Sequence, residues 1–241
     1  MAVNSNLINP REIERKLYIG TAIVFPLVVL AGYFKSYYFS VLFPEIPSVA
    51  NTLVHAHGLV MSAWVLYFVA QVALIRTKNV RLHMTMGLAG IALAALVVVV
   101  GMATAYDAQL VRGAAPPGVN PHSFFIFPAS DMSLFVILFA TAIYYRKKST
   151  EHKSLMLLTA INFLPAALFR LPVVSPENMI WWAFGAPALL TIAILAFHTW
   201  KHRKLNKVFA AGAALLLIAV PLRPIISETN VWLSFVGWLA P

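Results

Sequence analysis

The chain has 241 residues, of which 61% are hydrophobic and only 11% are charged, and its formal net charge is +10. A soluble domain carries about 25% charged residues, so this composition excludes a protein whose whole surface faces water. The apolar residues fall in blocks of about 20 or more, the length needed to cross a bilayer. The positive charge therefore indicates orientation in a membrane, and we do not expect nucleic acid as a partner.

The apolar blocks predict helices. Inside lipid every backbone N–H and C=O must be paired, which leaves helices or closed barrels, and these blocks lack the period-two alternation of a barrel strand. The chain has no cysteine, which excludes disulfides and thiolate-ligated metal or haem. The expected fold is all-α, a single domain that covers residues 1–241.

Seven membrane-spanning helices are predicted, which would form a seven-helix bundle. The expected spans are residues 17–39, 50–75, 82–106, 122–145, 152–171, 177–200 and 208–222. Turn residues after the third span predict a loop without helix from residue 107. The tail, 230–241, is too short to cross and carries Trp232 and Trp238. Tryptophan suits the headgroup layer, so we expect this tail to lie along the membrane surface.

Basic residues predict the orientation. The N-terminal segment and the boundaries after the second, fourth and sixth spans hold 14 of the 18 Lys and Arg residues, whereas the opposite side holds four. Short loops rich in Lys and Arg stay in the cytoplasm. We therefore expect a multi-pass protein of the cell inner membrane with a cytoplasmic N-terminus and an outer C-terminus, and the lipid bilayer as its first partner.

Histidines recur near the ends of four successive spans. His57 and His122 lie near the outer face, and His83 and His152 lie near the inner face. Neutral imidazole binds haem iron, and two facing helices can supply both axial ligands. The alternation predicts two b haems stacked across the bilayer, one held by His57 and His122 and the other by His83 and His152. Electrons could then cross the membrane.

Small residues beside these histidines favour the same interpretation. Gly58 follows His57, and Gly87 and Gly90 follow His83 in the third span. A glycine leaves room for a porphyrin to approach the backbone. A histidine at a helix end beside Lys and Arg is, however, more often a plain interfacial residue, and His152 also fits that description.

The outer histidines support a second hypothesis, a non-haem metal or small-molecule site. His55 or His57, together with His122 and Asp131, would form the two-histidine, one-carboxylate set that suits iron or zinc. His55 and His57 point about 200° apart around a helix. We expect His57 to face the bundle, because Met61 continues its face at helical spacing.

The depth of Asp131 weakens the metal hypothesis. It lies nine residues after His122, which is roughly 13 Å along a straight helix, whereas a shared metal requires both side chains within about 2 Å of it. An ion pair between Asp131 and Arg170 or Arg223 is the competing interpretation. The amides of Gln71 and Asn162 lie inside spans, where such groups more often join helices by hydrogen bonds.

Two resemblances bear on function. The order of histidines on four successive helices resembles the di-haem b-type cytochromes that pass electrons from ascorbate across membranes. The segments VHAHG, LHMTMGLAG and EHKSLMLLTAINFLPAALFRLP resemble a set of uncharacterised bacterial multi-pass membrane proteins, over about half of the chain. That set implies a bacterial inner membrane and no particular activity.

Three functions stay open from the sequence. The first is a haem-binding redox protein that exchanges electrons with a quinone or another small reductant. The second is the outer non-haem metal or small-molecule site. The third is an accessory or assembly subunit without chemistry of its own, whose partner is another membrane protein.

Overall fold

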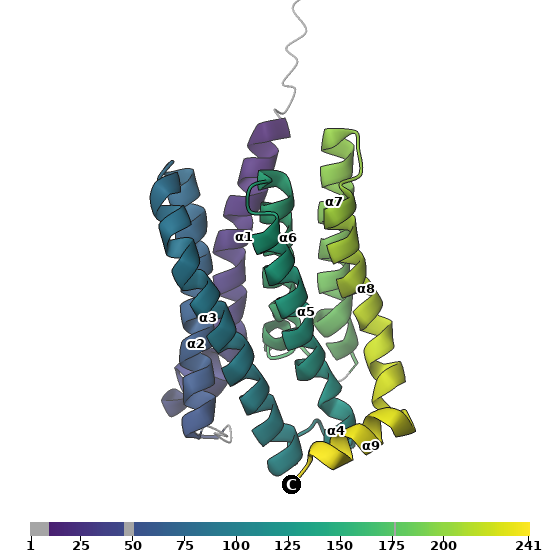
Figure 1. The fold of residues 1–241 in the computed structure, drawn as a ribbon. Helices are drawn as coiled ribbons and strands as arrows, with labels where there is room; N and C mark the ends of the chain where they lie inside the picture. Colours follow the sequence, from purple (N-terminus) through teal and green to yellow (C-terminus); the bar gives the residue numbers. More distant parts are fainter. Residues whose placement is uncertain (1–9, 46–50, 176) are drawn as a thin grey trace, which may run out of the picture.

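The computed structural model describes residues 10–45, 51–175 and 177–241, and all regular structure in these ranges is helical (Figure 1). The long helices are α1 (Pro10–Tyr33), α2 (Thr52–Arg76), α3 (Val80–Tyr106), α5 (Ile126–Tyr144), α6 (Ser149–Leu168), α7 (Ala186–His202) and α8 (Lys207–Ser227). The short elements are η1 (Phe34–Tyr38), η2 (Ser40–Leu42), η3 (Asp107–Val111), α4 (Pro121–Phe124), η4 (Trp181–Gly185) and α9 (Asn230–Leu239).

Within these ranges, six helical stretches are long and apolar enough to cross a membrane. They are Arg15–Tyr38, Thr52–Arg76, Val80–Val111, Pro121–Tyr144, Trp181–His202 and Lys207–Ser227. Each overlaps one of the predicted spans, although the expected start of the second span, Ala50, lies outside the described residues. The chain is therefore a multi-pass α-helical membrane protein.

The remaining predicted span, 152–171, corresponds to α6, which is less apolar than these six stretches and is not among them. It lies inside the bundle, packed against α1, α5, α7 and α8. Its buried residues include Ser154, Thr159 and Asn162. A helix enclosed by other helices can carry polar groups that would be costly against lipid. The expected count of seven apolar spans is therefore not met, and six are found.

Side-chain caps explain where several helices begin. The amide oxygens of Asn51, Asn79 and Asn206 accept a backbone N–H at the starts of α2, α3 and α8. Thr229 caps α9 in the same way. Asn and Thr at this position satisfy one of the four unpaired N–H groups of a helix start. Local sequence thus sets these boundaries.

The two ends of the bundle differ in charge. Most of the Lys and Arg residues lie at one end of the bundle, here named the basic end (Figure 1). This end holds the start of α1 and the α2–α3, α5–α6 and α7–α8 connections. The α4 and α9 segments lie at the other end, here named the α9 end (Figure 1). The predicted alternation of the chain between the two ends is confirmed.

The loop after α3 begins later than predicted. The chain stays helical through η3, which ends at Val111. The helix stops before Gly113, whose φ is +64°, and Gly118 has a φ of +78°. Such left-handed conformations suit glycine, and the Pro and Gly residues that break helix all lie beyond Val111. The prediction of loop from residue 107 was therefore wrong by about one turn.

The C-terminal tail forms helix α9, which lies across its end of the bundle (Figure 1). Val236 is fully buried, and the indole Nε1 of Trp232 donates to the His122 carbonyl at 3.0 Å. The Tyr106 hydroxyl donates to the Leu239 carbonyl at 2.9 Å. Trp238, on the other face, is 78% exposed. One face of the tail is thus docked on the bundle, and the other carries exposed aromatic surface.

Candidate functional site

His83 and His152 lie together at the basic end of the bundle. The centroids of their rings are 6.4 Å apart and the ring planes cross at 78°. His83 stands in the first turn of α3 and His152 in the first turn of α6. The structure therefore brings together the two residues that the sequence assigned to an inner haem.

A hydrogen bond fixes the orientation of the His152 ring. Its Nδ1 lies 2.9 Å from the carbonyl oxygen of Ala142 in α5. A carbonyl only accepts, so this bond requires the hydrogen on Nδ1 and leaves the lone pair on Nε2. A metal-binding histidine is commonly held in this way, by a bond from its second nitrogen to a carbonyl.

The His83 ring is less fully satisfied. Its Nδ1 is buried and has no hydrogen-bond partner among the described residues. Most buried polar atoms have a partner, and leaving one without costs about 1–3 kcal/mol. Both rings are thus held by backbone groups, His152 by Ala142 and His83 by Gln71, while Nδ1 of His83 stays buried without a partner among the described residues.

Helix α2 supports α3 next to this pair. The Tyr67 hydroxyl donates to the Met86 carbonyl and accepts a bond from Gln71 Nε2 at 2.5 Å. A Cβ on Gly90 would lie 2.6 Å from that hydroxyl, so a larger residue there would displace the Tyr67 ring end. The second amide atom, Gln71 Oε1, is buried and has no partner in the part of the chain that the structure describes.

Of the three glycines expected to make room for a porphyrin, one leaves open space. A Cβ on Gly58 would lie 2.2 Å from the Tyr37 ring, and Tyr37 therefore fills the space beside it. Tyr67 fills the space beside Gly90 in the same way. No atom lies within 4 Å of a Cβ built on Gly87, one turn after His83. The described structure thus leaves space beside Gly87, and tyrosine rings occupy the space beside Gly58 and Gly90.

At the α9 end, His55 and His57 point in different directions. His55 is exposed and lies against Tyr37, with ring centroids 5.8 Å apart. His57 is half-buried, and its Nδ1 is buried with no partner among the described residues. His57 is therefore the one that faces the bundle, as its helical face indicated.

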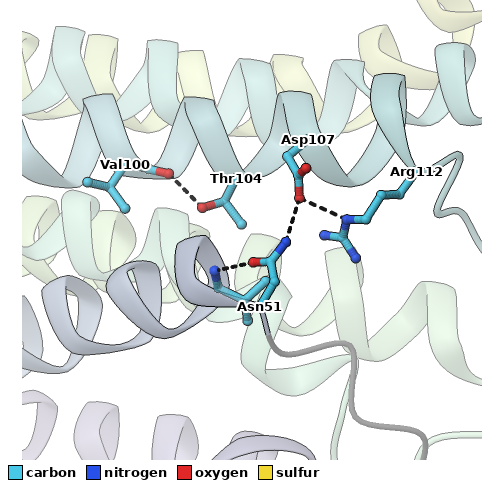
Figure 2. A network of polar contacts seen from close by, with 6 residues as sticks. Asn51, Val100, Thr104, Asp107 and Arg112 are labelled. Atoms are coloured by element: carbon cyan, nitrogen blue, oxygen red, sulfur yellow. Dashed lines mark hydrogen bonds and ion pairs between the residues drawn. The ribbon is translucent and has the colours of Figure 1, made fainter.

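A polar network fixes the start of α2 beside these histidines (Figure 2). Asn51 caps α2 and donates from Nδ2 to Asp107 Oδ2 at 3.2 Å, and Arg112 Nε binds the same oxygen at 2.8 Å. Asp107 thus joins the α2 start to the end of α3. Its carboxylate is committed to these two partners and to neither histidine.

The structure does not join His57 to His122. His122 stands in α4, which packs against η3, α5, α8 and α9, whereas α2 packs against α1 and α3. Ring contacts between histidines in the described chain join only His83 with His152 and His198 with His202. No ring contact in the described chain therefore joins the outer haem pair predicted from the sequence.

Asp131 forms a buried ion pair with Arg223. Its Oδ1 lies 2.6 Å from Arg223 Nη2, and Arg223 is 6% exposed. Asn162 Nδ2 also donates to the Asp131 carbonyl at 2.9 Å, which joins α6 to α5. The alternative of an ion pair is thus the one observed. In the described ranges, no three His, Asp or Glu side chains gather in a group that could hold a metal.

A small cavity adjoins this ion pair. It has a volume of about 30 Å³ and is lined by Asp131, Asn162, Thr191 and Arg223 among apolar residues of α5, α6, α7 and α8. Within the described ranges, Asn162 Oδ1 and Arg223 Nε are buried without hydrogen-bond partners. A cavity of this size holds one or two water molecules, so it suits ordered water rather than a substrate.

The sequence interpretation left one histidine pair without a role. His198 and His202, one turn apart on α7, have ring centroids 4.4 Å apart. Their i, i+4 spacing is visible in the sequence, but a position beside Lys201 is also typical of a plain interfacial pair. The burial of His198 could be learned only from the fold.

Comparison of the chain with protein-family models, with curated proteins and with solved structures finds no match. The site is therefore interpreted from its own residues.

Proposed function

We propose that this protein is a haem-binding redox protein, with one b-type haem held at the basic end between His83 and His152. The observation that carries the proposal is the approach of these two rings, 6.4 Å apart, from helices that are distant in the sequence. Two imidazole nitrogens each about 2 Å from one metal place the ring centroids about 6 Å apart. The observed separation would allow both rings to hold one such metal.

The surrounding residues support the same assignment. The bond from His152 Nδ1 to the Ala142 carbonyl leaves Nε2 as the ligand atom. His83 Nδ1 is buried without a partner among the described residues, and the open space beside Gly87 lies on the side of α3 next to His83. The Tyr67 hydroxyl, itself bound by Gln71, joins α2 to α3 at Met86, three residues after His83.

A haem in this position supplies reversible one-electron oxidation and reduction. The site lies at one end of the bundle, so its partner is a quinone or a protein that reaches the same membrane face. Because His57 and His122 are apart, we propose a single haem rather than a pair that conducts electrons across the bilayer. Asp131 was the carboxylate of the alternative non-haem metal site at the α9 end, and it is already paired with Arg223.

Ligand variants test this assignment. His83→Ala and His152→Ala are expected to abolish the Soret band and the sharp reduced α and β bands of the purified protein. His55→Ala is the matched control, because His55 is an exposed histidine outside the site. Circular dichroism checks that each variant folds.

Persistence of the wild-type spectrum in both ligand variants would overturn the assignment. A folded wild-type protein that shows no Soret band after expression with ample haem would also overturn it. The interpretation as an accessory subunit, with a co-purifying membrane partner, would then be the one to pursue.

We also propose that α6 is a seventh crossing and that the basic end is cytoplasmic. Its 20 residues extend about 30 Å, the thickness of the hydrocarbon core. The excess of Lys and Arg at one end supports the orientation in an inner membrane.

Single cysteines in this cysteine-free chain test both statements. A cysteine at Lys147, before α6, is expected to react only from the cytoplasmic side. A cysteine at Val173, after α6, is expected to react only from the outside with a reagent that does not cross membranes. Labelling of both positions from one side would show that α6 does not cross.

A further inference from the structure

A second pair of histidines lies at the basic end on α7. His198 and His202 are one turn apart, with ring centroids 4.4 Å apart and planes tilted by 32°. Residues at i and i+4 share one face of a helix, which is the spacing that helical zinc sites use for two imidazole ligands. The observed geometry already places the two rings beside each other.

His198 is buried in an unusual state for an imidazole. It is 6% exposed, and both Nδ1 and Nε2 are buried with no hydrogen-bond partner among the described residues. Phe209 of α8 packs edge-on against its ring, with centroids 5.4 Å apart. Burying an imidazole with neither nitrogen satisfied is destabilising, and a bound metal would remove part of that cost.

His202 gives this pair access to the aqueous phase, because it is exposed at the end of α7. The charged groups that face the pair are Glu151 and Lys153 of α6 and Lys201 of α7. Glu151 favours a cation here, and the two lysines oppose one. The pair would supply two protein ligands to a metal ion, and water would fill the other coordination positions.

We propose that His198 and His202 form a binding site for a borderline divalent transition metal ion such as Zn²⁺, separate from the pair formed by His83 and His152. Neutral imidazole is a preferred ligand for Zn²⁺. Open positions on such an ion make it a place where a further ligand, from a cytoplasmic protein or a small molecule, can bind. The site is independent of the proposed haem.

The test is a titration of the purified, tag-free full-length chain in detergent with ZnCl₂, and the heat of binding is measured by isothermal titration calorimetry. One Zn²⁺ per chain is expected. A residue that only supports a metal ligand contributes about 10- to 100-fold in affinity. A ligand itself contributes at least as much, so His198→Ala and His202→Ala are each expected to weaken Zn²⁺ binding by about 100-fold. His202 is exposed, so its replacement leaves folding intact even where His198→Ala does not.

Two controls make the outcome decisive. His55→Ala removes an exposed histidine elsewhere and is expected to leave Zn²⁺ binding unchanged. His83→Ala with His152→Ala removes the other pair and is likewise expected to leave it unchanged. Binding that survives His202→Ala, binding lost only with His83 and His152, or no binding by the wild-type chain would each overturn the proposal.

Discussion

Replacing Asp131 with alanine is expected to lower the free energy of unfolding by about 3–5 kcal/mol, the usual cost of leaving one member of a buried ion pair alone. Arg223 is 6% exposed, and its Nη2 lies 2.6 Å from Asp131 Oδ1. Without that carboxylate its positive charge stays in a medium of low dielectric constant with no anion beside it. Unfolding in detergent micelles, followed by circular dichroism, measures the loss.

The chain contains a matched control for this variant. Asp107 also pairs with an arginine, Arg112, at 2.8 Å, but both side chains are partly exposed, at 24% and 32%. Partly exposed pairs contribute about 0–1 kcal/mol, so Asp107→Ala is expected to cost far less than Asp131→Ala. Equal losses in the two variants would show that burial does not determine the importance of the Asp131 pair.

A double variant separates the ion pair from packing. Replacing a buried ion pair with apolar residues of similar size is often neutral or stabilising. Asp131→Leu with Arg223→Met is therefore expected to recover most of the stability lost in Asp131→Ala. Failure to recover would indicate that the adjoining cavity, rather than the lone charge, dominates the loss.

Gly32→Ala is the second variant with a large expected effect. A Cβ at this position would lie 2.2 Å from the carbonyl oxygen of Ala167 in α6 and 2.8 Å from its carbonyl carbon. These are backbone atoms, which cannot move aside as a flexible side chain can. Extra volume in a packed core costs about 1–3 kcal/mol, and α1 would have to separate from α6. The unfolding midpoint in detergent measures the loss.

Gly20→Ala on the same helix is the control. No atom lies within 4 Å of a Cβ built there, and alanine favours helix over glycine by about 0.8–1 kcal/mol. This variant is expected to be neutral or slightly stabilising. A loss of stability at Gly20 as large as at Gly32 would mean that the close approach of α1 and α6 is not the cause.

Much of the architecture was predictable because lipid leaves few choices. Long apolar blocks located six crossings, and the clusters of Lys and Arg marked the end at which each connection lies. The helix α6 was harder to classify, because whether Ser154 and Asn162 face lipid or protein depends on which helices enclose it. Composition does not contain that information.

The candidate site was predictable in part for the same reason. Chain alternation places the starts of α3 and α6 at one end, which made His83 and His152 a reasonable pair. It also placed His57 and His122 at one end, yet those two do not meet, because α4 packs towards α8 and α9. Side-chain packing between helices decides which helices are neighbours. The spacing of residues along the chain does not show that packing.

The other differences have similarly local causes. Gly58 and Gly90 were expected to leave space for a porphyrin, but the rings of Tyr37 and Tyr67 from neighbouring segments fill the space beside them. Asp131 was a candidate metal ligand until its partner across the bundle was known. A sequence shows which groups are costly to bury, and only the fold shows which partner reduces that cost.

The most direct test of the proposed haem site is the number of haems per chain in the purified protein, from the pyridine haemochrome spectrum and the protein concentration. One b-type haem per polypeptide is the predicted result, because only His83 and His152 form a facing pair on separate helices in the described chain. No haem in folded protein supplied with haem would contradict the account. Two haems per chain would contradict its claim of a single site.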